Sequence, residues 1–169
     1  MQCNVVNVKV SIKIEAPLLN IVQEQANNNN LFSKLYNNYL VVKAKYTYII
    51  FKPNKNKNHN HINITKIPNT KFVTEAISEI ENLLKVKHFD FKIDNIVASG
   101  NFMRHIDILE IVKKRLFEKI KYNNQKFPGL FIKFNRGTAI IFHSGKVVLV
   151  GCKDLNDIEW ITQQLVANI

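Results

Sequence analysis

The segment FPGLFIKFNRGTAIIFHSGKVVLVGCK, from Phe127 to Lys153, decides the fold class of this chain. Three turn-forming pairs interrupt its apolar runs, at Pro128-Gly129, Arg136-Gly137 and Ser144-Gly145. Because such pairs separate the strands of antiparallel hairpins, the segment predicts a three-stranded meander. Apolar side chains fall on both faces of these strands, so each face requires a cover.

One cover follows directly in the sequence. Residues 154–169 have the periodicity of an amphipathic helix that begins at Asp154. Its apolar stripe consists of Ile158, Ile161, Leu165 and Ile169. No helix remains for the other face, which is flanked by Lys133, Lys146 and Lys153. An apolar sheet face flanked by lysines is typical of proteins that bind the minor groove of DNA.

The composition favours a polyanionic partner. The chain has 169 residues and a formal net charge of +11, from 24 Lys and Arg against 13 Asp and Glu. Abundant Lys, Asn and Ile are also the signature of an AT-rich genome, so the charge alone does not decide the partner. The 46% hydrophobic content suffices for a packed core, and no apolar run approaches the roughly 18 residues of a membrane helix. We expect a soluble protein of the cell interior, with free thiols at Cys3 and Cys152.

The two halves of the chain have the same predicted order of elements. In the first half, strand, helix, β-rich segment, polar loop, strand and helix fall at residues 5–14, 17–26, 36–51, 52–60, 61–67 and 70–85. In the second half, a strand at 91–100 and a helix near 106–121 precede the meander and the closing helix. The chain therefore reads as an internal repeat.

An alignment of the halves makes the repeat specific. An offset of 91 residues places Asn4 on Asn95, Val6 on Val97, Tyr36 on Phe127 and Phe51 on Phe142 without a gap. An offset of 85 aligns the two closing helices. Each half alone would expose a sheet edge and apolar surface. We therefore expect residues 1–88 and 89–169 to join in one α+β domain, a continuous antiparallel sheet with helices on its convex face.

Three segments resemble the second half of the TATA-box-binding protein family: FPGL at 127–130, IIFHSGKVVLVGCK at 140–153 and DNIVAS at 94–99. That family has two such halves in tandem, and the resemblance extends loosely over the first half of this chain. It implies a saddle of two pseudo-symmetric repeats and a divergent family member of protist or viral origin. It also implies a transcription initiation factor of the nucleus, or of a cytoplasmic viral factory, that needs no cofactor.

The resemblance assigns aromatic wedges. In that family each half inserts two phenylalanines into the duplex, which kinks the DNA and opens its minor groove. The second-half pair would be Phe127 and Phe142, and Phe51 matches Phe142 in the first half. The partner of Phe51 is Tyr36 by constant spacing, or Tyr39 if the intervening loop has shortened. AT-rich sites are favoured because TA steps unstack most easily. The competing interpretation places these rings in the core.

The resemblance also assigns polar contacts. Asn95 matches the family position that hydrogen-bonds minor-groove acceptors, and A·T pairs present only acceptors there. Its first-half mate is Asn4 by spacing or Asn7 by strand parity. The resemblance further implies that Val97 and Val148 contact the floor of the groove. It implies phosphate contacts by Lys133, Ser144 and Lys146, and a groove contact by the first-half hydroxyl of Thr65.

The sequence departs from the family pattern in three places. Val150 replaces a groove-contacting threonine, whose first-half equivalent is Thr65. The segment 122–126 lacks the two glutamates with which the family grips transcription factor IIB. The loop 52–60 replaces a tight turn beside the DNA edge, where it would either add phosphate contacts or obstruct the groove.

Two functions fit these observations. The first is an initiation factor that binds and bends AT-rich duplex DNA, with transcription factor IIB-like and other basal factors and RNA polymerase as partners. The second is an interaction adaptor of the same fold that has lost DNA bending. No phosphate-binding glycine loop, nucleophile elbow or ligand cluster beside His59 and His61 indicates an enzyme or a metal site. Pairing of two free copies through the groove stays open, and no membrane association is predicted.

Overall fold

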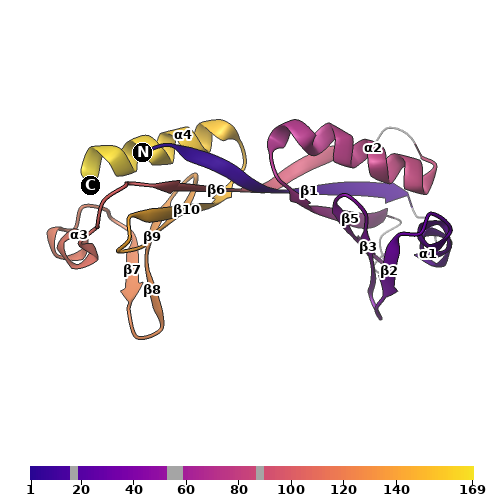
Figure 1. Cartoon of the computed structure of the whole chain (residues 1–169), viewed down its shortest axis with the longest axis horizontal. Helices are drawn as coiled ribbons and strands as arrows, with labels where there is room; N and C mark the ends of the chain where they lie inside the picture. The colour runs from indigo at the N-terminus through magenta and orange to yellow at the C-terminus, as the bar shows by residue number, and fades with distance from the viewer. Residues whose placement is uncertain (16–18, 53–58, 87–89) are drawn as a thin grey trace. The chain divides into compact units, whose positions relative to one another are not determined.

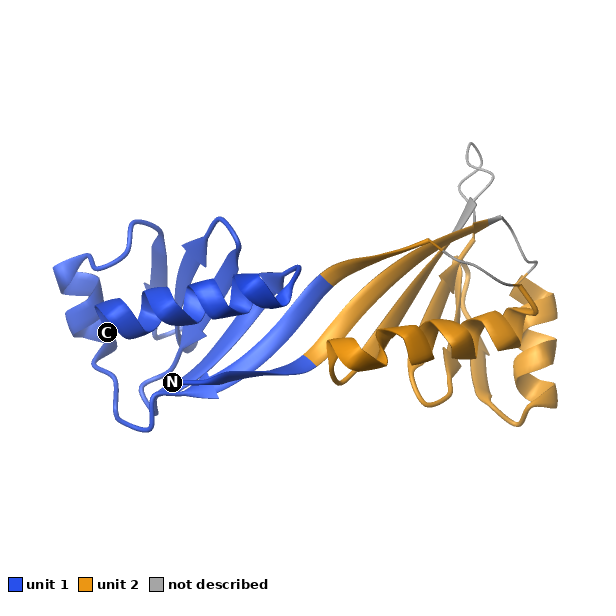
Figure 2. Cartoon of the chain, turned by 90° about the horizontal axis from the view of Figure 1, so that it is seen from above, with its two compact units in different colours: residues 1–6, 95–169 blue, residues 7–94 orange. Residues whose placement is uncertain are grey.

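The computed structural model describes residues 1–15, 19–52, 59–86 and 90–169 (Figure 1). They form two compact units: unit 1 comprises residues 1–6 and 95–169, and unit 2 comprises residues 7–94 (Figure 2). The ten strands are hydrogen-bonded in the order β2-β3-β4-β5-β1-β6-β10-β9-β8-β7. The predicted α+β class is confirmed. The expected start of the first helix at residue 17 and most of the expected loop 52–60 lie outside the described residues.

Unit 1 contains the start of β1, most of β6, four further strands and two helices. Apart from β1, their bounds are β6 Phe91–Asn101, α3 Ile108–Lys114, β7 Ile120–Asn123, β8 Phe127–Phe134, β9 Gly137–Ile141, β10 Lys146–Cys152 and α4 Leu155–Asn168. The predicted meander is present as β8, β9 and β10, which pair in antiparallel order. The predicted closing helix is present as α4.

Alternate strand residues of unit 1 form a core under α4. The fully buried ones are Ile96, Ala98, Leu130, Ile132, Ala139, Ile141, Val147 and Leu149. Three of the four predicted stripe residues of α4, namely Ile158, Ile161 and Leu165, are buried as well. The side chain of Asp154 accepts from the N–H of Asp157 at 3.0 Å, and this capping box starts the helix. In Figure 1, α4 lies on one side of β6 and β10, and the β7–β8 hairpin extends on the other side of these two strands.

The helix predicted near 106–121 is wrong in length. α3 ends at Lys114, because Arg115 adopts the left-handed conformation (φ 49°) and its N–H closes the last turn. Residues 120–123 instead form strand β7, which pairs with β8 through Ile120 and Ile132. Pairing with a neighbouring strand therefore outweighs the helical periodicity of this segment.

Unit 2 repeats the arrangement. It contains most of β1, whose first residues belong to unit 1; the bounds are β1 Cys3–Glu15, α1 Leu19–Asn28, β2 Phe32–Leu35, β3 Tyr39–Lys43, β4 Thr47–Phe51, β5 His59–Ile67, a 3₁₀ turn Thr70–Phe72 and α2 Val73–Leu84. The α2 side chains Ala76 and Ile80 are fully buried, as are Val10 and Ile12 of β1. The hydroxyl of Tyr48 donates to the carbonyl oxygen of Ala76 at 3.0 Å, which ties β4 to α2.

The strand pairing defines which residues of the two units correspond. Thr47 pairs with Thr65 in unit 2, and Thr138 pairs with Val150 in unit 1, as the predicted offsets of 91 and 85 require. The first strand departs from this rule. Val8 pairs with Ile67, whereas Ile96 pairs with Cys152, so β1 corresponds to β6 at an offset of 88. The gap-free alignment is therefore wrong for the first strand.

Candidate nucleic-acid interface

The face of unit 1 opposite to α4 consists of the strand residues that alternate with the core. These half-buried or exposed residues are Asn95, Val97, Ser99, Phe131, Lys133, Thr138, Ile140, Lys146, Val148 and Val150. Cross-strand pairs link them, such as Val148 with Ile140 and Lys133 with Thr138. We call this surface the open face of unit 1, and it contains most of the second-half residues predicted for DNA contact.

Phe127 and Phe142 form an aromatic pair at the end of the β8–β9 hairpin. Their ring centroids lie 5.8 Å apart at an interplanar angle of 63°, and Phe127 also contacts Phe131 at 5.2 Å. Phe127 is 39% exposed and Phe142 is half-buried, so neither ring is sealed in the core. A Cβ atom at Gly129 would lie 2.6 Å from the Phe127 ring. The absence of a side chain at Gly129 therefore makes room for the pair.

The corresponding pair of unit 2 is built differently. Leu40 pairs with Ile50 and Leu130 with Ile141, so β3 corresponds to β8 at an offset of 90. Tyr39 therefore takes the position of Gly129, and Phe127 corresponds to Asn37 rather than to Tyr36. Tyr39 lies directly opposite Phe51 with ring centroids 5.7 Å apart, and Tyr36 stacks on Tyr39 at 4.7 Å. The structure thus brings Tyr39, and not Tyr36, against Phe51.

The position of Asn95 is fixed by a β-bulge. Its Oδ1 atom accepts from the N–H of Gly151 at 2.6 Å, and Gly151 has a φ of 82°. Because Oδ1 is engaged, the amide presents its Nδ2 hydrogens as the remaining donors. The offset of 88 makes Asn7 the mate of Asn95, and Asn4 is an exposed residue of unit 1. In unit 2 the bulge falls at Lys66 (φ 65°), and the buried Oδ1 of Asn7 has no partner among the described residues.

The open surface of unit 2 is more polar than that of unit 1. Lys9 corresponds to Val97, in place of the predicted Val6, and Asn63 corresponds to Val148. The Nζ atom of Lys9 lies 3.8 Å from a carboxylate oxygen of Asp94, and the Ser11 hydroxyl donates to the other oxygen at 3.0 Å. Only unit 1 therefore has valines at both positions expected to contact the groove floor.

Hydroxyl groups occupy both surfaces next to the bulges. The Thr65 hydroxyl donates to the carbonyl oxygen of Thr47 at 3.4 Å. Val150 lacks a hydroxyl, but its cross-strand neighbour Thr138 supplies one on the open face of unit 1. The sequence alignment missed Thr138, although it is the counterpart of Thr47 at the predicted offset of 91.

The turn after β9 carries Phe142 and the predicted phosphate contact Ser144, and the second predicted phosphate contact, Lys146, begins β10; both contact residues are exposed. The Nδ1 atom of His143 lies 3.1 Å from the Ile106 carbonyl oxygen, and its Nε2 atom lies 3.2 Å from the Tyr122 hydroxyl. Gly145 has a φ of 83°, and its N–H donates to the Phe142 carbonyl oxygen at 2.9 Å. These contacts hold the turn beside the aromatic pair.

The two cysteines lie on the helix-covered side of the sheet or at its edge as free thiols. Cys3 is half-buried and Cys152 is buried. Burial raises the pKa of both thiols, that of Cys152 to about 11, so they are protonated at neutral pH. Within the described ranges, no group of three or more His, Cys, Asp or Glu residues is placed to hold a metal ion. The helices in those ranges are too short or too polar to cross a membrane.

Fold and site together define a class: a two-repeat α+β protein with a helix-covered face and an uncovered face that bears an aromatic pair. The structure of Methanococcus jannaschii TBP has this fold, with a TM-score of 0.78 over 99% of this chain and 98% of that one at 22% identity. Residues 90–169 match the family described as transcription factor TFIID, or TATA-binding protein. The second half of the chain thus matches the TATA-binding protein family, and the whole chain shares the fold of a TATA-binding protein.

The sequence similarity is concentrated in part of the chain. The TATA-box-binding protein of Methanobrevibacter smithii is 39% identical over 70 residues, which are 40% of this chain and 38% of that protein. That of Aeropyrum pernix is 33% identical over 96 residues, or 56% and 45% of the two chains. These matches therefore span less than half the length of the curated relatives.

Proposed function

We propose that this protein is a transcription initiation factor that binds the minor groove of AT-rich, TATA-like promoter DNA and bends it. The proposal rests on one observation above all, the Phe127–Phe142 pair, which lies at the end of an apolar face without a helical cover. Wedging a ring into a base step costs a few kcal/mol of stacking, which the wider contact with bent DNA offsets.

The amide of Asn95 supports a preference for A·T base pairs in the bound DNA. Its Oδ1 is bound to the N–H of Gly151, so the group available to DNA is a hydrogen-bond donor. The minor groove of A·T pairs presents acceptors only, whereas a guanine adds an amino group that would face this donor. Val97 lies two residues from Asn95 on the open face, and Val148 pairs with Ser99 of the same strand; both valines suit the apolar floor of such a groove.

The family and the net charge of +11 support a role at promoters. We expect transcription factor IIB-like and other basal factors and the RNA polymerase machinery as partners, in the nucleus or in a cytoplasmic viral factory. A mobility-shift assay with TATA duplex and a transcription factor IIB homologue tests this. A ternary complex that forms only in the presence of this chain is the expected result, and its absence would remove the partner assignment.

Energy transfer between dyes at the two ends of a TATA-containing duplex tests the bending. We expect binding of the wild type to raise the transfer efficiency, and the double variant Phe127→Ala with Phe142→Ala to bind without that rise. Phe91→Ala serves as the control, because Phe91 is an exposed phenylalanine (49%) outside the aromatic pairs. Binding without a bend in the wild type would favour the adaptor function, and an unchanged bend in the double variant would reject the wedges.

A further inference from the structure

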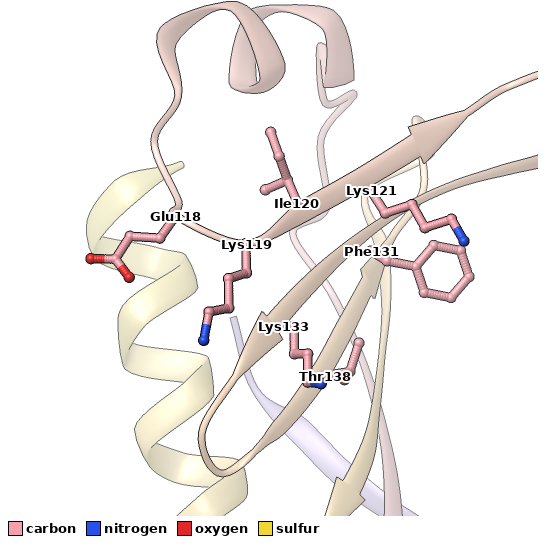
Figure 3. A pocket seen from close by; sticks show the side chains of 7 residues that line it. All are labelled: Glu118, Lys119, Ile120, Lys121, Phe131, Lys133 and Thr138. Atoms are coloured by element: carbon pink, nitrogen blue, oxygen red, sulfur yellow. The ribbon is translucent and has the colours of Figure 1, made fainter.

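A basic pocket lies beside the open face of unit 1, at its outermost strand. It has a volume of about 560 Å³ and is lined by Glu118, Lys119, Ile120, Lys121, Phe131, Lys133 and Thr138 (Figure 3). Lys121 pairs with Phe131, and the N–H of Lys133 donates to the carbonyl oxygen of Lys119 at 2.9 Å. Lys119, Lys121 and Lys133 therefore share the face that carries Phe131 and Thr138.

The three ammonium groups are available to a ligand. All three lysines are exposed, and none forms an ion pair with another residue of the described ranges. Glu118 is the single carboxylate among the lining residues, and it is directed away from Lys121 and Phe131 in Figure 3. The pocket therefore combines a local excess of positive charge with a hydroxyl from Thr138 and an aromatic edge from Phe131.

The corresponding positions of unit 2 carry two lysines instead of three. Phe32 pairs with Lys43 and Lys34 with Val41, so Phe32, Lys34 and Lys43 correspond to Lys119, Lys121 and Lys133. The Nζ atom of Lys43 lies 4.8 Å from the centre of the Phe32 ring, and that of Lys34 lies 5.2 Å from the Tyr36 ring. Phe32 thus replaces one of the three lysines, and the ammonium groups of Lys34 and Lys43 each form a cation–π contact with an aromatic ring.

We propose that the pocket of Lys119, Lys121 and Lys133 binds backbone phosphates of duplex DNA, and that unit 1 is thereby the stronger electrostatic anchor. This inference rests on the proposed function, because it extends the DNA contact of the open face to β7. Lys121 lies in β7 and Lys119 immediately precedes that strand, so the two lysines are two residues apart, or about 6.6–6.8 Å in extended backbone. A row of charges along a strand suits a continuous polyanion better than a single small anion.

The anchor gives the two units different roles on DNA. Phosphate contacts position a protein without reading the bases, so unequal contacts at the two ends favour one orientation on an asymmetric site. The lysines of unit 1 would thereby fix the orientation in which the Phe127–Phe142 pair and the Asn95 amide contact the DNA. The signal was present in the sequence as Lys119-Ile120-Lys121-Tyr122, an alternation that the helical interpretation of this segment obscured.

Two matched double variants test the proposal on a labelled AT-rich duplex. Lys119→Gln with Lys121→Gln removes two charges from unit 1, and Lys34→Gln with Lys43→Gln removes two from unit 2. We expect the unit 1 variant to bind about 10-fold more weakly and to lower the slope of log affinity against log salt by about 2. We expect the unit 2 variant to change the affinity and the slope by less than half as much.

Neutral methylphosphonate linkages, introduced one at a time along each DNA strand, locate the contact. The linkage that replaces the bound phosphate should weaken binding of the wild type and leave the Lys119→Gln, Lys121→Gln variant unaffected. Equal effects of the two double variants, or no linkage that couples to Lys119 and Lys121, would overturn the anchor. Tighter, equally lysine-dependent binding of single-stranded RNA would also overturn it.

The bending assay separates this result from the function itself. If the wild type binds duplex DNA through Lys119 and Lys121 without bending it, the anchor stands and the wedge mechanism falls. If the wild type bends DNA and the two double variants behave alike, the function stands and the anchor falls.

Discussion

The Oδ1 atom of Asn95 accepts a hydrogen bond from the backbone N–H of Gly151 at 2.6 Å. The bond ties a side chain of β6 to the bulge in β10 and decides which end of the amide is free. Asn7 occupies the same register position in unit 2, where its buried Oδ1 lacks a described partner. The two asparagines are therefore equivalent in position and unequal in their hydrogen bonding.

Asn95→Asp is expected to weaken binding to an AT-rich duplex by about 1–3 kcal/mol. The carboxylate can still accept from Gly151, so the fold is retained, but the donor that faces the groove is lost. The penalty should shrink when the central A·T pair is replaced by G·C, because a carboxylate accepts from the guanine amino group. Binding titrations on both duplexes measure this, with Asn4→Asp as the control for added charge. Equal penalties for the two variants would contradict the role of Asn95.

Gly129→Ala is expected to destabilise the protein by about 1–3 kcal/mol, because the new Cβ would lie 2.6 Å from Phe127 and 2.8 Å from Ile140. Urea unfolding measures the loss. Adding Phe127→Ala to the same chain removes one of the two overlaps and should recover part of the stability without restoring a DNA bend. If the double variant were no more stable than Gly129→Ala, the overlap with Phe127 would not be the cause.

Tyr39→Ala is expected to reduce the DNA bend more than Tyr36→Ala. Tyr39 supports Phe51 directly across the strand pair, whereas Tyr36 touches only Tyr39 among the described rings. End-to-end energy transfer on a TATA duplex compares the two variants. A larger loss in the Tyr36 variant would restore the assignment by constant spacing and reject the one by strand register.

The free energy of unfolding is expected to fall as the pH rises from about 9 to about 11. Burial raises the pKa of Cys152 from 9.0 to about 11, so the thiol ionises at a lower pH in the unfolded state than in the folded state. Ionisation therefore stabilises the unfolded state relative to the folded state in this pH range. Burial raises the pKa of Cys3 and Tyr48 in the same direction. Urea unfolding at pH 8 and pH 10.5 measures the difference, which Cys152→Ala should reduce. A stability that is flat over this range, or the same slope in the variant, would argue against a buried thiol.

The sequence predicted the elements that depend on local signals. The turns at Arg136-Gly137 and Ser144-Gly145 and the stripe of α4 were sufficient for the meander and its cover. The fold class and the similarity to TATA-binding proteins were also predicted. The short strand β7 was missed, since the apolar spacing of Val112, Leu116 and Ile120 continues a helical pattern, and only β8 provides the competing hydrogen bonds.

The correspondence of the two halves required the strand register. Asn4 and Asn7 are each followed by a valine, so local sequence does not distinguish them. The mate of Asn95 is decided by the bulges at Lys66 and Gly151, which are set by long-range pairing. Likewise the paired residues Lys43 and Thr47 are one residue closer in sequence than their counterparts Lys133 and Thr138, and nothing in the sequence of Tyr36 to Phe51 marks the deletion. The DNA contacts assigned to these residues stay predictions.

Tyr39 stands where unit 1 has Gly129, and this exchange limits what can be transplanted between the halves. A chimera that receives Gly129 and the turn of unit 1 in unit 2 without Phe127 would have space for a ring that Asn37 cannot fill. In each hairpin the aromatic ring, the residue beneath it and the length of the turn therefore depend on one another. We call these three parts together the hairpin cassette. Repeat-swapped proteins should tolerate exchange of the whole cassette and fail when only one of its parts is exchanged.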